Sequence, residues 1–253
     1  MPPPLPLGTS ARILAQHHTG LIALEKPAGL ASHPNGPSDK KQALLNAPYN
    51  LDDEYYQLAD GTRLFLLNRI DSPTSGLVLA TAEHTLAAHI KKLFRAHDGS
   101  VSKTYYAIVK GARLPFPQGT WRDRLSKRHD SNSKLRATQG GNGGLPAISH
   151  YQWLGGTRTP LSISLLKLSP QTGRTHQLRI QCAMHEHPIA GDKTYGDFTF
   201  NRTLGKQTHP PSTRLFLHAH TLKLRFIWNS HHEEFSATSP IPDTFKQFDL
   251  PCP

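Results

Sequence analysis

The sequence has few cysteines, few acidic residues and no long apolar run. Its two cysteines, Cys182 and Cys252, are too few for a disulfide framework or a cysteine zinc cluster, which favours a reducing, cytoplasmic setting. We find no apolar stretch long enough to cross a bilayer, so we expect no membrane partner. The proline-rich start lacks the basic and apolar regions of a signal peptide. These deficits argue against a secreted, disulfide-stabilised protein and against an integral membrane protein.

Basic residues, by contrast, are abundant. There are 29 Lys and Arg against 18 Asp and Glu, a formal net charge of +11. A polyanion is the natural partner of such a chain, and nucleic acid is favoured because no basic amphipathic helix is evident. The 16 histidines include three close pairs, but no acid or cysteine follows them at a familiar ligand spacing, so we expect no metal site. The pairs are His17 with His18, His218 with His220, and His231 with His232.

The most informative stretch of the sequence runs from Leu64 to Ala80. Two short apolar runs, Leu64 to Leu67 and Leu77 to Ala80, are typical of buried strands. The connection between them carries Arg69 and Asp71, and a rigid strand pair that presents an arginine and a carboxylate is a good platform for chemistry. The alternative is an ordinary turn in which Asp71 and Ser72 bind their own backbone.

The remaining elements follow from periodicity. Thr81 to His97 is predicted to be a helix with Thr81 as its N-cap, and 175–185 a second helix. Strands are predicted at 21–26, 102–111, 147–155, 160–169 and 217–226. Residues 113–146 carry a surplus of five positive charges and end in a glycine-rich run, so we expect a basic loop. It is either solvated or in contact with RNA.

The segment from Asn68 to Gly76 resembles the His-Arg-Leu-Asp-x-x-Thr-Ser-Gly signature of the RluA family of pseudouridine synthases, with Asn68 in place of the usual His and Ile70 in place of Leu. Four further segments resemble the family in the same order, namely 21–34, 102–111, 171–196 and 217–226. The stretch from Gly191 to Arg202 is similar to the tRNA pseudouridine synthase C branch.

The resemblance implies an α+β fold: a single catalytic domain with a long mixed, mostly antiparallel β-sheet and a central active-site cleft. It places this domain at 20–253, after an N-terminal arm at 1–19 that is too short for the S4-type RNA-binding domain of many relatives. It implies that a specific uridine of a structured RNA, expected to be tRNA, is isomerised to pseudouridine. The nucleotide must flip out to be reached.

The resemblance also assigns roles to individual residues. Asp71 is the essential residue, which either attacks C1′ of the ribose or takes the C2′ proton. Tyr105 is the active-site tyrosine that stacks on the uracil, and Arg179 is the arginine that pairs with the catalytic aspartate. Four further residues are expected to bind substrate or support the site: Arg69, Arg174, His176 and Lys26.

Isomerisation needs neither a redox change nor a group donor, so no cofactor and no metal are expected, and we expect a cytoplasmic monomer whose partner is RNA. One alternative is an rRNA (23S-type) pseudouridine synthase, and another is a non-catalytic RNA-binding relative. A retaining glycosidase is disfavoured because it needs two facing carboxylates, and no second acid lies in a matching motif.

Overall fold

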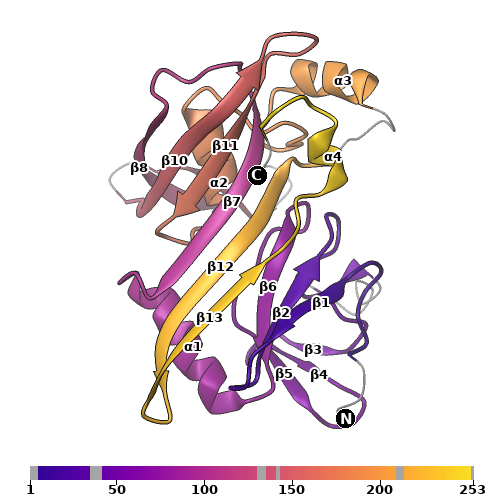
Figure 1. Ribbon diagram of the computed structural model, residues 1–253, viewed down its shortest axis with the longest axis vertical. Coiled ribbons are helices and arrows are strands. Elements are labelled where there is room, and N and C mark those ends of the chain that lie inside the picture. Colours follow the sequence, from indigo (N-terminus) through magenta and orange to yellow (C-terminus); the bar gives the residue numbers. More distant parts are fainter. Residues whose placement is uncertain (1–4, 35–41, 130–134, 141–142, 209–213, 252–253) are drawn as a thin grey trace. The chain divides into compact units, whose positions relative to one another are not determined.

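The computed structural model describes residues 5–34, 42–129, 135–140, 143–208 and 214–251, which contain four helices and thirteen strands (Figure 1). The chain divides into two compact units, Met1–Ser102 with Ala219–Pro240 and Lys103–His218 with Ile241–Pro253. Each strand pair with a defined register is antiparallel within this described part. The expected α+β class with antiparallel strands is confirmed. None of the described helices is long and apolar enough to cross a membrane.

The first unit is built on two strands, one of which pairs along its whole length with the other. Strand β2 (Leu21–Lys26) is mostly buried, and β6 (Ser75–Thr81) is buried throughout. Their register runs from Leu21 opposite Thr81 to Lys26 opposite Gly76. Because Lys26 faces Gly76, the turn that follows β2 lies beside the loop that precedes β6. The register therefore brings two segments with family-like motifs together.

The other strands of the first unit extend this pair. β1 (Arg12–Gln16) pairs with β2, so part of the predicted N-terminal arm is an edge strand. β3 (Tyr49–Asn50), β4 (Tyr55–Gln57) and β5 (Arg63–Leu66) lead in order to β6, and β6 is followed in the sheet by β12 (Leu217–Trp228). β12 and β13 (His231–Thr238) form the long hairpin in Figure 1.

Helix α1 (His84–Ala96) covers the apolar core of this unit. Its buried side chains, Leu86, Ala87 and Ile90, recur at the spacing that predicted the helix. The predicted N-cap is wrong, because the Glu83 side chain accepts the Thr85 N–H and Thr81 instead accepts the Glu83 N–H. A glutamate carboxylate reaches the first turn as a serine or threonine hydroxyl would.

The second unit is a five-stranded antiparallel array in the order β7-β11-β10-β8-β9. Its strands are β7 (Val101–Lys110), β8 (Gln118–His129), β9 (Leu135–Gln139), β10 (Leu145–Thr157) and β11 (Ile163–Pro170). Three helices accompany them: α2 (Gln177–Met184), α3 (Phe198–Gln207) and α4 (Asp243–Lys246). Sequence periodicity missed α3, which carries a single fully buried residue, Leu204.

The predicted loop at 113–146 is largely a β-hairpin, formed by β8 and β9. In β8 the side chains of Trp121 and Leu125 are buried, whereas Arg122 and Arg124 are exposed. The inward-facing Asp123 accepts a hydrogen bond from Gln181 Nε2 at 2.8 Å. The charge-based prediction of a loop was wrong because exposed arginines alternate with only a few buried apolar residues, which is a strand pattern with a polar face.

Candidate functional site

Asp71 lies in the loop of residues 67–74, hereafter the Asp71 loop, which joins β5 to β6. Both of its neighbours are fixed by the turn after β2, residues 27–34. Ser32 Oγ accepts the Ile70 N–H at 3.1 Å and donates to the Ile70 carbonyl at 2.9 Å. On the other side, the Gly29 N–H and the Ser72 hydroxyl each donate to the other residue's carbonyl, at 2.8 and 2.9 Å. The backbone that carries the Asp71 carboxylate is therefore held from both sides.

Lys26 also holds the 27–34 turn and the Asp71 loop together, from inside the unit. Its side chain is fully buried, and its ammonium donates to the carbonyls of Pro27 at 3.0 Å, Leu30 at 2.6 Å and Ser72 at 3.0 Å. A buried ammonium is tolerated when its protons are used in this way. These contacts make Lys26 a support that ties the 27–34 turn to the residue after Asp71, and a direct contact of Lys26 with RNA stays a prediction.

Asn68 closes the base of the Asp71 loop. Its Oδ1 accepts the Leu79 N–H at 2.7 Å and its Nδ2 donates to the Leu77 carbonyl at 3.4 Å. The side-chain amide thus stands in for a strand backbone at the position where the family usually has His. At the far end of the loop, Gly76 has φ +115° and a Cβ there would lie 2.1 Å from the Ala219 carbonyl oxygen, so the position requires glycine.

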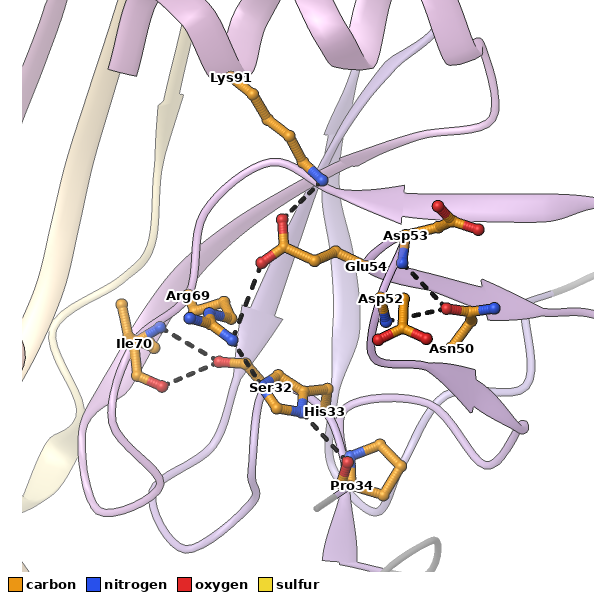
Figure 2. A network of polar contacts seen from close by, with 10 residues as sticks. All are labelled: Ser32, His33, Pro34, Asn50, Asp52, Asp53, Glu54, Arg69, Ile70 and Lys91. Carbon is orange, nitrogen blue, oxygen red and sulfur yellow. Dashed lines mark hydrogen bonds and ion pairs between the residues drawn. The ribbon is translucent and has the colours of Figure 1, made fainter. Parts of the chain in front are cut away.

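The Arg69 side chain points toward a polar network and away from the contacts between the 27–34 turn and the Asp71 loop (Figure 2). Its Nη1 lies 3.0 Å from His33 Nε2 and 3.9 Å from Glu54 Oε1. Because arginine only donates, His33 Nε2 must accept, which places the proton on Nδ1 toward the Pro34 carbonyl at 3.1 Å. Glu54 also accepts from Lys91 of α1 at 2.8 Å. Arg69 is therefore oriented although its side chain is 55% exposed.

The electrostatics of this network favour one charge state at neutral pH. Burial, together with the charge of Arg69, lowers the pKa of His33, so the neutral acceptor persists. Burial alone would raise the pKa of Glu54, but the hydrogen bond from Lys91 and the nearby cations lower it overall. The Arg69 guanidinium is thus held by a neutral imidazole and a carboxylate.

In the second unit, Arg179 of α2 forms a buried bidentate ion pair with Asp192. Arg179 Nε lies 2.7 Å from Asp192 Oδ2 and Nη2 lies 2.8 Å from Oδ1. Asp192 also accepts the backbone N–H groups of Thr194 at 2.8 Å and Tyr195 at 3.1 Å. Burial would raise the pKa of Asp192, but Arg179 and these donors hold it below its usual value. Sequence reasoning did not identify Asp192, although it lies in a motif that resembles the family.

Tyr195 links Arg179 to His176. The Arg179 guanidinium lies 5.1 Å from the centre of the Tyr195 ring, and the Tyr195 hydroxyl is 2.9 Å from His176 Nδ1. His176 precedes α2 with φ 55°. Arg174 is held differently, since its Nε donates to the Pro146 carbonyl at 3.0 Å. The second unit therefore positions Arg179 through two partners and Arg174 through a strand backbone.

Tyr105 lies on β7, opposite Leu168 of β11. It is partly buried and packs against an apolar cluster that contains Ala107 and Leu168, whereas Tyr106 packs into a different cluster with Ile108. The two tyrosines therefore face opposite sides of β7, as expected from the alternation of side chains along a strand.

The residues predicted from the sequence thus form two groups. Lys26, Arg69 and Asp71 lie in the first unit, and Tyr105, Arg174, His176 and Arg179 lie in the second. The contacts join Lys26 to the Asp71 loop, and His176 to Arg179 through Tyr195. The pairing of Arg179 with Asp71, and the approach of Tyr105, stay predictions.

Comparison with known proteins identifies the class. The family described as RNA pseudouridylate synthase matches residues 20–184, which include Asp71, Tyr105 and Arg179. The chain belongs to this family, and the resemblance drawn from the sequence motifs is confirmed.

Curated relatives and solved structures are consistent with this assignment. The chain is 32% identical over 81% of its length to a tRNA pseudouridine synthase C of Pectobacterium carotovorum and spans only 53% of that protein. Proteins of the same name from Yersinia pestis and Haemophilus ducreyi are 32% and 35% identical and are covered over 77% and 80% of their length. The human RNA pseudouridylate synthase domain containing 4 protein has the same fold, with a TM-score of 0.66, 24% identity, and coverage of 93% of this chain and 90% of that one.

Proposed function

We propose that this chain is an RNA pseudouridine synthase that isomerises one uridine of a tRNA. The observation that supports this proposal most directly is the structure of the Asp71 loop. The residues on either side of Asp71 are fixed by the 27–34 turn and by the buried Lys26 ammonium. Such support fixes the backbone that carries a catalytic group. The tRNA substrate class rests on the names of the relatives.

In the proposed reaction, the N1–C1′ bond of the uridine breaks, the uracil turns, and C5 joins C1′ while the C5 proton leaves and N1 takes up a proton. Asp71 attacks C1′ or takes the C2′ proton. Tyr105 stacks on the uracil, and Arg179 pairs with Asp71. Arg69, held toward solvent by His33 and Glu54, fills the gap that the flipped nucleotide leaves. The enzyme is proposed to act as a cytoplasmic monomer without a cofactor.

The test is tritium release from tRNA that carries C5-labelled uridine. Asp71→Asn should abolish release and leave the circular dichroism spectrum and the tRNA affinity near wild type. Asp53→Asn, which changes an exposed aspartate of the same unit, is the matched control and should release tritium normally. Release by Asp71→Asn at the wild-type rate would remove Asp71 from the chemistry.

Two measurements separate the alternatives: tritium release in vitro, and the pseudouridines present in RNA from a strain that lacks the protein. A non-catalytic relative would bind tRNA and release no tritium in its wild-type form. For an rRNA enzyme, a strain that lacks the protein would lose a pseudouridine from rRNA and keep all those in tRNA. Re-expression of wild-type protein, but not of Asp71→Asn, should restore the missing tRNA pseudouridine.

A further inference from the structure

The turn between β1 and β2 brings two imidazoles to a carboxylate of β13, all in the first unit. His18 Nε2 lies 3.1 Å from Glu233 Oε2, and His17 Nε2 lies 3.9 Å from the same oxygen. One ligand atom from each of the three residues lies within 4.8 Å of the others. The sequence pointed to His17 and His18 but offered no acid near them, because Glu233 is 215 residues from His18.

These separations fit a small divalent cation. Tetrahedral Zn²⁺ with bonds of about 2.0–2.2 Å to imidazole nitrogen and carboxylate oxygen keeps its ligand atoms about 3.3 Å apart. The observed 3.1 and 3.9 Å bracket that value, and the two imidazole nitrogens lie within 4.8 Å of each other, so side-chain movements must close the site around the ion. Two nitrogens and one oxygen are also a donor set that zinc accepts, with the fourth position left to water.

The surroundings orient the first imidazole. His17 Nδ1 lies 2.9 Å from the Thr19 hydroxyl, which fixes the ring so that Nε2 remains toward Glu233. The ring of Phe235 packs edge-on at 5.5 Å between ring centres. A hydrogen bond to the second ring nitrogen is the usual outer contact of a metal-binding histidine.

Glu233 is a mostly buried carboxylate whose partners are imidazoles. Its side chain is only 13% exposed, and in the part of the chain that the structure describes its ion pairs are with His17 and His18 alone. A divalent cation would use both imidazoles as neutral ligands and balance the carboxylate charge. His18 is 71% exposed, which leaves an entry route from solvent.

We propose that His17, His18 and Glu233 bind one divalent cation of the zinc class and thereby clamp the β1–β2 turn to β13. This site lies at the N-terminal end of β2, whereas Lys26, which supports the Asp71 loop, ends the same strand. The six residues of β2 span about 17 Å from Leu21 to Lys26. The cation would therefore stabilise the unit without taking part in chemistry at Asp71.

The test is calorimetric titration of the chelator-treated 253-residue chain with zinc chloride near neutral pH. Wild type should bind one equivalent, and zinc should raise its melting temperature. Glu233→Gln, and independently the exposed His18→Asn, should each weaken binding by about tenfold or more, and Thr19→Val by about tenfold. The double variant His231→Asn, His232→Asn changes an exposed adjacent pair on the same strand as Glu233 and should bind as wild type does.

Two results would overturn the proposal. Zinc binding that survives both Glu233→Gln and His18→Asn but disappears in the His231, His232 control would assign it to surface histidines. Absence of binding to wild type would make the cluster a set of hydrogen bonds only. Because zinc should leave tritium release unchanged, these results are independent of the proposed enzymatic activity.

Discussion

At the scale of single residues, the buried pair of Arg179 and Asp192 is expected to contribute strongly to stability. Asp192→Asn leaves the Arg179 charge without its bidentate partner, and loss of one member of a buried pair typically costs about 3–5 kcal/mol. The free energy of unfolding in urea measures this. Lys246→Ala breaks the exposed pair with Asp243, whose side chain is 94% exposed, and should change stability by less than about 1 kcal/mol. Equal costs in the two variants would contradict the prediction.

The same pair predicts a pH dependence. Because the folded-state pKa of Asp192 is lowered from its usual 3.8, the stability it contributes is fully present above that value. It is lost as pH falls through the lower folded pKa. The difference in stability between wild type and Asp192→Asn should therefore be constant near neutral pH and shrink only in strong acid.

Arg174→Ala should be milder than Arg179→Ala in both stability and tritium release, since Arg174 Nε makes one hydrogen bond to a strand carbonyl.

Lys26 offers a second prediction at this scale. Lys26→Met keeps the length of the side chain but leaves the carbonyls of Pro27, Leu30 and Ser72 without the ammonium. We expect a loss of roughly 1.5–3 kcal/mol in stability. Single-turnover tritium release should slow at least tenfold, because a misplaced catalytic group is costly. The tRNA dissociation constant should stay near wild type. A weaker affinity with a normal single-turnover rate would instead restore Lys26 to a direct role in RNA binding.

At the scale of elements, the hairpin of β8 and β9 presents arginines on its outer face. The double variant Arg122→Ser, Arg124→Ser should reduce the slope of log affinity against log salt by roughly one for each phosphate that the variant no longer neutralises. Lys223 and Arg225 form the matched control, because they too are basic, exposed and two residues apart on one strand. If both double variants change the slope equally, the contribution of the β8–β9 hairpin is only general charge.

Some helices and strands could be predicted from the sequence and others could not. Helix α1 was predictable because its apolar residues recur at helical spacing, β11 because its apolar residues alternate, and β2 and β6 because they contain short apolar runs. Strand β8 was not, since its inward face includes Asp123 and its outward face is strongly charged. Asp71 was found through its motif. The supports from Ser32 and Lys26 depend on the register between β2 and β6, and no local pattern encodes a register.

At the scale of the whole molecule, the net charge of +11 bears on substrate binding rather than on the chemical step. Lysines and arginines release counterions from phosphate, so tRNA affinity should fall steeply with salt. The fold also brings together groups that are far apart in the sequence, such as His18 with Glu233 and Asp71 with the 27–34 turn. Composition predicted the polyanionic partner, whereas both clusters required the tertiary structure.

The last prediction concerns metal removal from the intact protein. Isomerisation of uridine breaks one glycosidic bond and forms one carbon–carbon bond, with no net redox change and no donor group. The residues proposed to carry it are a carboxylate, a tyrosine and arginines, none of which needs a metal to act. Protein dialysed against EDTA should therefore release tritium at the untreated rate under single-turnover conditions, while its melting temperature falls if zinc was bound at His17, His18 and Glu233. Glu233→Gln should match the dialysed wild type in both measurements. A loss of tritium release that zinc restores in wild type but not in Glu233→Gln would show that the two ends of β2 are coupled, and it would overturn the metal-independent mechanism.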